Sequence, residues 1–178
     1  MSKIRPLDYV LAALMTAAGV FLMWENITAD RNDPSLIHQL STQSWLIMPA
    51  FLLVTVPILW RRRNIVAVVG VTVLATVAHV LAFDWLTRCG VVLPLSFALA
   101  YAVARFARTR RDHLLGLAGI VVLLVVTLLR DSSADLAGAL PIALPGAALF
   151  YGAGLLVQNR VSKRQQPAAV PAAEQATV

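Results

Sequence analysis

The chain has 178 residues with a formal net charge of +6, and 59% of its residues are hydrophobic while only 13% are charged. Soluble globular domains carry roughly a quarter charged residues and about half apolar ones, so this composition excludes an ordinary water-soluble fold and indicates a membrane protein. The positive charges gather at the ends of apolar segments instead of forming a basic surface interleaved with aromatic residues, which argues against nucleic acid as a partner.

Six apolar segments approach the length of about 20 residues that a transmembrane helix needs. They predict an all-α integral membrane protein, a bundle of about six transmembrane helices. Several segments are short, so we expect tilted helices or a locally thin bilayer. The last segment contains two prolines and four glycines, and a bundle of five helices is the alternative if this segment does not span. The predicted spans are residues 7–24, 45–60, 64–83, 89–105, 114–129 and 136–157.

Twelve of the fifteen lysines and arginines lie in four clusters that alternate with pairs of apolar segments. Basic residues concentrate on the cytoplasmic side of membrane proteins, so this pattern predicts that both termini are cytoplasmic in a bacterial plasma membrane. In this topology the cytoplasmic side holds twelve basic and three acidic residues, and the other side holds three basic and six acidic residues. We expect the clusters to fix the topology and to contact anionic lipid heads. They comprise Lys3, Arg5, Arg61, Arg62, Arg63, Arg105, Arg108, Arg110, Arg111, Arg160, Lys163 and Arg164.

The first apolar segment has two interpretations. Its basic start, its apolar middle and the small residues near 27–29 are compatible with a cleaved signal peptide. Trp24, Glu25 and Asn26 instead favour the interfacial end of a helix that stays attached to the protein.

Two regions outside the predicted spans have distinct compositions. The longest loop, 25–44, contains a helix-start signal at 32–35 followed by apolar residues at helical spacing, so we expect a short helix lying on the membrane surface. Residues 161–178 are rich in alanine and proline and provide no apolar surface to bury. We therefore expect a disordered cytoplasmic tail at 161–178 behind a transmembrane domain at 1–160.

Ionisable groups inside a bilayer are costly, which makes them the first candidates for a functional site. His79 lies about four residues inside one end of its segment, either as a ring hydrogen-bonded to a neighbouring helix or as a pH- or ligand-sensitive group. Asp84 and Arg88 follow it four residues apart, a spacing that allows a pair across one helical turn. Cys89 is either a small packing residue or an intermolecular or redox-reporting thiol. These four residues form a candidate sensing cluster at the outer face.

The sequence predicts neither a catalytic centre nor a metal site. His38 and His79 lie on one side of the predicted membrane and His113 lies on the other, so the histidines do not converge on one metal ion. The apolar segments contain no paired carboxylates, and the sequence contains no Gly-rich phosphate loop and no Gly-x-Ser-x-Gly elbow. We therefore expect a protein without enzymatic activity or cofactor.

Small residues recur at four-residue spacing on two of the predicted helices. Ala98 with Ala102, and Ala100 with Ala104, form such stripes on the fourth segment. Residues 13 and 17 form another on the first segment. Small residues let helices approach closely in membranes, so the stripes predict either packing within the bundle or the face of a homodimer.

Several motifs resemble the N-terminal, multi-span membrane input domain of actinobacterial sensor histidine kinases. The resemblance covers about residues 5–160, and its most distinctive part is the Leu-Trp-Arg-Arg-Arg sequence that closes one apolar segment. The motifs are Val-Pro-Ile-Leu-Trp-Arg-Arg-Arg at 56–63 with an apolar segment at 65–77, Leu-Ala-Tyr-Ala-Val-Ala-Arg at 99–105, Arg-Thr-Arg-Arg at 108–111, Leu-Leu-Gly-Leu at 114–117 and Arg-Pro-Leu-Asp at 5–8.

The resemblance implies a sensory or regulatory module of a two-component signalling system. Kinases of this class continue into a helix with a phosphoacceptor histidine and an ATP-binding domain, and neither has a counterpart in this sequence. The expected protein is therefore a free-standing input module that acts through a signalling partner or as a homodimer. The sequence leaves two alternatives, a small transporter or channel subunit and a structural membrane protein.

Overall fold

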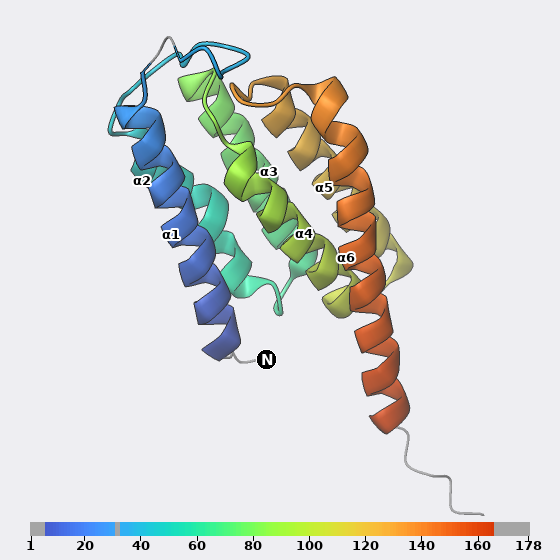
Figure 1. Ribbon diagram of the computed structural model, residues 1–178. Helices are drawn as coiled ribbons and strands as arrows, with labels where there is room; N and C mark the ends of the chain where they lie inside the picture. The colour runs from blue at the N-terminus through green and yellow to red at the C-terminus, as the bar shows by residue number, and fades with distance from the viewer. Residues whose placement is uncertain (1–5, 31–32, 166–178) are drawn as a thin grey trace, which may run out of the picture.

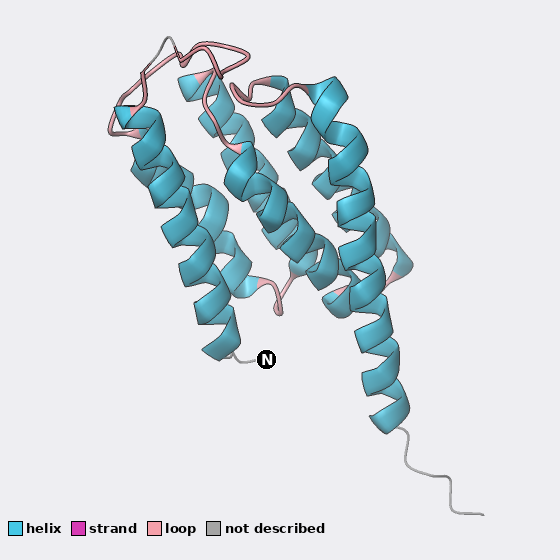
Figure 2. Cartoon of the chain, in the orientation of Figure 1, coloured by secondary structure: helices cyan, strands magenta, loops and turns pink. Residues whose placement is uncertain are grey.

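The structure is a computed structural model that describes residues 6–30 and 33–165, and the helices of this part lie side by side as one bundle (Figure 1). The described residues contain helices and connecting loops, with one isolated β-bridge in place of any strand (Figure 2). This confirms the predicted all-α class. The elements are α1 (Pro6–Thr28), α2 (Ile47–Thr55), the 3₁₀-helix η1 (Val56–Trp60), α3 (Ile65–Phe83), α4 (Cys89–Phe106), α5 (Arg110–Leu129) and α6 (Leu136–Gln165).

Five of the described helices, α1, α3, α4, α5 and α6, are long and apolar enough to cross a membrane. The predicted span at 45–60 is shorter than expected, because the apolar helix covers only Ile47–Trp60 and changes from α to 3₁₀ geometry at Val56. Pro57 explains the change, since proline lacks the amide donor of an α-helical hydrogen bond and its ring collides with the carbonyl four residues earlier. At the usual rise per residue this unit is roughly 23 Å long, less than a hydrocarbon core of about 30 Å.

Side chains at the helix starts explain two boundaries. Asn64 accepts a hydrogen bond from the backbone of Ala67, which places the start of α3 close to the predicted boundary at 64. Helix α5 begins at Arg110, four residues before the predicted span, because Thr109 and Asp112 form a reciprocal capping box. A span predicted from apolar residues alone does not include this polar first turn.

Helix α4 is the central helix of the bundle and packs most extensively on α6. A Cβ atom added at Gly154 would lie 2.6 Å from both the Tyr101 carbonyl oxygen and the Ala104 Cβ, so only glycine permits this approach of α6 to α4. Ala100, Ala102 and Ala104 are buried. The alanine stripe on α4 therefore serves packing within the bundle, one of its two predicted roles.

Two expectations about the flanking regions need correction. The described part of the 25–44 loop contains turns and bends but no surface helix, because α1 itself continues to Thr28 and the following backbone bonds to other loops. Helix α6 extends to Gln165 and projects past the other helices at the end where the N-terminus lies (Figure 1). The first residues of the expected 161–178 tail are thus helical, and residues 166–178 lie outside the described part of the chain.

Candidate functional site at the loop cap

Three connections meet at the end of the bundle away from the N-terminus (Figure 1). We call residues 33–46, 84–88 and 130–135 together the loop cap. Backbone hydrogen bonds tie the three segments to one another: the amide of Ser132 donates to Leu86 over 3.2 Å, and the amide of Ile37 donates to Ser132 over 2.9 Å. The amide of Ser41 donates to Trp85 over 2.9 Å. The cap is therefore a connected structure and not three independent turns.

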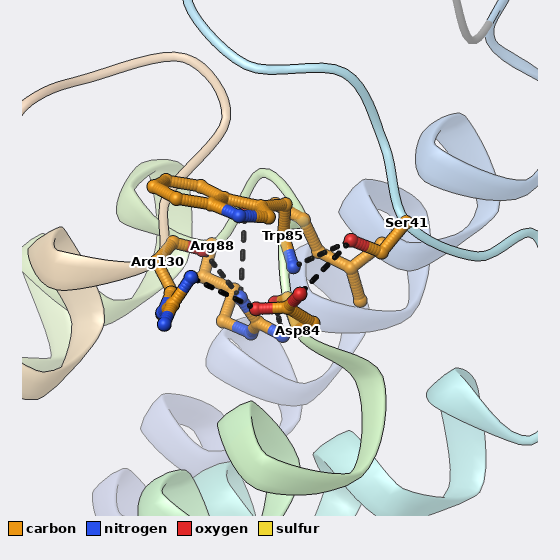
Figure 3. Close-up of polar contacts among 6 residues, drawn as sticks. Ser41, Asp84, Trp85, Arg88 and Arg130 are labelled. Atoms are coloured by element: carbon orange, nitrogen blue, oxygen red, sulfur yellow. Dashed lines mark hydrogen bonds and ion pairs between the residues drawn. The ribbon is translucent and has the colours of Figure 1, made fainter.

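Arg88 occupies the centre of the loop cap, and its side chain is fully buried. Its Nη2 donates to the carbonyl oxygen of Asp84 over 2.7 Å, and its Nη1 donates to the carbonyl oxygen of Arg130 over 2.9 Å (Figure 3). Its Nε lies 3.1 Å from Nδ1 of His79. The guanidinium thus joins the end of α3 to the end of α5 through a rigid set of donors.

The contact with Arg88 determines the tautomer of His79. A guanidinium can only donate, so Nδ1 of His79 must accept, and the ring is neutral with its proton on Nε2. Nε2 lies 3.3 Å from the carbonyl oxygen of Ile47 and donates to this oxygen. The ring also contacts Phe51 and Phe83, with centroid separations of 5.3 and 4.9 Å. His79 thereby connects Arg88 to the first turn of α2, as the hydrogen-bonded interpretation of this residue predicts.

Asp131 supplies the negative charge of the site and is also fully buried. Its Oδ2 accepts hydrogen bonds from the backbone amides of Arg88 and Cys89, each over 2.7 Å, at the N-terminus of α4. Its Oδ1 accepts from the amide and the hydroxyl of Ser133 over 3.0 and 2.8 Å. A carboxylate at this position satisfies orphan amides and opposes the positive end of the helix dipole.

Arg88 keeps its charge in spite of its burial. Removal from water lowers the pKa of the Arg88 guanidinium to about 10, and the carboxylates of Asp131 and Asp84 act in the opposite direction. A pKa of this size leaves the group protonated near neutral pH. The site is therefore a buried cation that is held by carbonyl dipoles and a neutral imidazole, with two carboxylates nearby.

Asp84 does not form the side-chain pair with Arg88 that the four-residue spacing allows. Helix α3 ends at Phe83, and Asp84 has φ of 51° and ψ of −127°, a left-handed conformation that is rare for a residue with a Cβ. Arg88 binds the Asp84 carbonyl, while the Asp84 carboxylate lies 3.5 Å from Nη1 of Arg130 (Figure 3). Asp84 and Arg130 are 54% and 50% exposed, so their ion pair contributes little stability.

Cys89 joins the same site through a different segment. It is the first residue of α4, it is half-buried, and its Sγ lies 3.3 Å from the hydroxyl of Ser133. The structure thus brings together all four residues of the predicted cluster, although Asp84 and Arg88 meet through the backbone.

Three residues of the site were not predicted. Asp131 resembles an ordinary loop acid in the sequence, and its partners Arg88 and Cys89 lie more than forty residues away. Asn26 is buried, and its amide accepts from Thr87 N and donates to Thr87 O, each over 2.9 Å, which joins α1 to the cap. Trp85 lies between the ring of His38, at 3.8 Å, and the guanidinium of Arg130, at 5.1 Å. In the sequence, only the position of Asn26 near the end of an apolar segment offered a signal.

The cationic clusters lie at the opposite end of the bundle, which we call the arginine end. Asp8 of α1 is fully buried there and accepts from Nη2 of Arg61 over 2.8 Å and from Nε of Arg62 over 2.7 Å. Two of the predicted lipid-contacting arginines therefore bind a carboxylate of the protein itself. Arg105 is half-buried and donates to the side-chain oxygen of Gln158. Lys3 and Arg5 lie outside the described residues, and the other predicted contacts are exposed: Arg63, Arg108, Arg110, Arg111, Arg160, Lys163 and Arg164.

Residues 6–30 and 33–165 contain no group of three or more His, Cys, Asp or Glu side chains placed to hold a metal ion. His113 lies at the arginine end, where its Nδ1 is 3.0 Å from the hydroxyl of Tyr151. The chemistry that the loop cap offers is hydrogen bonding and charge.

No protein-family model, curated protein or solved structure matches this chain. The resemblance to sensor-kinase input domains therefore stays a prediction from the motifs in the sequence.

Proposed function

We propose that this chain is a non-catalytic membrane module that passes the state of its loop cap to the cytoplasmic ends of its helices. The observation that carries the proposal is Arg88, a single buried side chain bonded to the ends of α3 and α5 and, through His79, to α2. A ligand or proton that alters one of these bonds acts on several helix ends at once. This is the property that a sensory input needs.

The proposed topology places the loop cap outside the cell and both termini in the cytoplasm. The ends of α4 and α6 and the starts of α1, α3 and α5 lie together at the arginine end (Figure 1). A single cationic end on a bundle with five long apolar helices supports insertion with that end in the cytoplasm of a bacterial plasma membrane.

Coupling along the bundle is proposed to run through α4 and α6. Asp131 holds the first amides of α4, and only residues 132–135 separate it from the start of α6. Oδ1 of Asp135 accepts from the amide of Gly138 over 2.9 Å and fixes the first turn of α6. Since α4 and α6 form the largest interface of the bundle, a shift of residues 130–135 changes how these two helices pack.

The motifs shared with sensor-kinase input domains support a signalling role, and the partner is then a kinase or another regulator. The buried hydroxyls of Thr76 and Thr127 bond to carbonyls of their own helices, at 2.8 Å each. These two hydroxyls are engaged within their own helices and are not free to bind a solute, which supports the regulatory role over transport.

The coupling is tested with Arg88→Lys, which keeps the charge but removes the planar set of donors. Spin labels on Arg108→Cys and Arg160→Cys in a Cys89→Ser background report the distance between the cytoplasmic ends of α4 and α6. We expect Arg88→Lys to shift or broaden this distance distribution in lipid nanodiscs. The matched control is Arg130→Lys, whose side chain is exposed and whose carbonyl remains available to Arg88. Equal distributions in both variants would contradict coupling.

The regulatory role is tested by mild crosslinking and affinity capture from native membranes through a C-terminal tag. We expect a kinase or regulator to be recovered with the wild-type protein and less of it with Arg88→Lys. A protein recovered alone, together with unchanged signalling outputs after gene deletion, would argue for a structural role.

A further inference from the structure

A groove of about 460 Å³ opens at the arginine end between α1, the segment after η1, and α4. One wall is apolar: Leu7, Val10 and Leu14 lie on one face of α1 and are 69%, 53% and 60% exposed. The other wall carries Arg61, Arg62 and Arg105. A charged rim above an exposed apolar wall is the arrangement of an amphipathic ligand site.

The charges of the groove do not balance. Asp8 is the carboxylate that Arg61 and Arg62 share, and no described Asp or Glu lies within salt-bridge distance of Arg105. Arg105 is therefore a cation without a carboxylate partner among the described residues. Asp8 is fully buried and bonded to both arginines, which places the guanidinium groups of Arg61 and Arg62 at the rim of the groove.

We propose that this groove binds one anionic phospholipid of the cytoplasmic leaflet. The phosphate contacts Arg61, Arg62 and Arg105, since guanidinium groups match phosphate oxygens in geometry and charge. An acyl chain lies along α1 from Leu7 to Leu14, a distance of about 10 Å at 1.5 Å per residue. A phospholipid offers a phosphate to the arginine wall and an acyl chain to the apolar wall. A free anion or bulk hydrocarbon matches only one of the two walls.

This lipid site rests on the proposed membrane topology and is independent of the sensory role. It differs from general attraction of lipid heads to exposed arginines, because it predicts a bound molecule at one position. Arg108 and Arg110 provide the contrast, since both are exposed at the same end and lie outside this groove.

The test measures lipid retained by the purified full-length protein with native mass spectrometry, after reconstitution with phosphatidylglycerol or with phosphatidylcholine. Arg105→Gln removes a cation without touching the Asp8 pair, and we expect about a tenfold loss of bound phosphatidylglycerol, the effect of losing one charge-assisted hydrogen bond. Val10→Trp fills the groove from its exposed wall and is expected to displace the lipid without changing charge. Arg110→Gln is the matched control and should retain the lipid.

Three results would overturn the site: equal loss in Arg105→Gln and Arg110→Gln, equal retention of the two lipids by wild type, or full retention in Val10→Trp. Each variant is also measured in the spin-label experiment on α4 and α6. Loss of lipid in Arg105→Gln with unchanged helix distances supports the lipid site and its independence from the coupling between α4 and α6. If Arg88→Lys shifts the distance between α4 and α6 but the wild-type protein binds no lipid, only the lipid site is refuted. Failure of the lipid site is therefore distinguishable from failure of the proposed coupling.

Discussion

Each end of the bundle buries charge, Arg88 and Asp131 at the loop cap and Asp8 at the arginine end, but the charges are satisfied in different ways. At the loop cap, the buried cation of Arg88 is held by backbone carbonyls and a neutral imidazole. At the arginine end, the buried anion of Asp8 is held by two flexible, partly exposed arginines. Carbonyl positions change only if helix ends move, whereas arginine side chains can follow a displaced partner. The bonds at the loop cap are therefore sensitive to displacement of the helix ends, whereas the bonds at the arginine end can adjust to such a displacement.

The largest effect is expected from Arg88→Met, which replaces the guanidinium with an apolar side chain of similar length. It leaves the carbonyls of Asp84 and Arg130 and His79 Nδ1 without their donor, and Asp131 without a neighbouring cation. We expect a loss of about 3–5 kcal/mol, the cost of breaking a buried ionic network by removing one member. Unfolding of the protein by SDS in mixed micelles measures this change. Arg130→Met, on the exposed side of the same cap, should lose less than about 0.5 kcal/mol.

A smaller effect is expected from Asp8→Asn at the other end. Arg61 and Arg62 are 13% and 20% exposed, so both can turn toward water or lipid phosphate when the carboxylate is removed. We expect a loss of about 2 kcal/mol, less than a fully enclosed pair costs. The same SDS titration should show a smaller loss with anionic lipid than with neutral lipid present. Glu25→Gln, an exposed acid on the same helix, is the control. A loss as large as that of Arg88→Met would remove the distinction between the two ends.

The smallest effect has the opposite sign. Asp84 adopts a positive φ at the end of α3, and glycine adopts this conformation without the clash of a Cβ. Asp84→Gly should therefore stabilise the protein by about 0.5–1 kcal/mol after the loss of the exposed ion pair with Arg130. Asp84→Ala removes the same carboxylate but keeps the Cβ, and it should not stabilise. Equal shifts in the two variants would show that backbone strain at Asp84 is absent.

The sequence predicts the helices much better than it predicts the contacts at their ends. Apolar length and the position of Asn64 place α3 and α4 within a residue or two, because each helix satisfies its own backbone. The start of α5 requires recognition of the Thr109 capping box. The shortness of the second span follows from Pro57, which the apolar pattern alone conceals.

The site could be predicted only in part. His79, Arg88 and Cys89 are close in sequence, and costly groups near a helix end indicate a cluster. Asp131 and Asn26 reach this cluster from 43 and 61 residues away along the chain, and one sequence gives no signal for pairing at that separation. The arginine end shows the same limit, since Asp8 meets Arg61 across 53 residues. These long-range pairs determine which charged side chains are buried in the protein and which stay exposed.

The close approach of α6 to α4 at Gly154 provides a point about which α6 can tilt. Eleven residues separate this contact from the end of the helix at Gln165, a distance of about 16 Å at 1.5 Å per residue. A tilt of about 10° around that contact moves the far end by about 3 Å, and the start of α6 at Leu136, about 27 Å away on the other side, moves by about 5 Å in the opposite direction. A rearrangement of several Å beside the loop cap is thereby passed to the arginine end, where a shift of about 3 Å is large enough to change a contact between side chains.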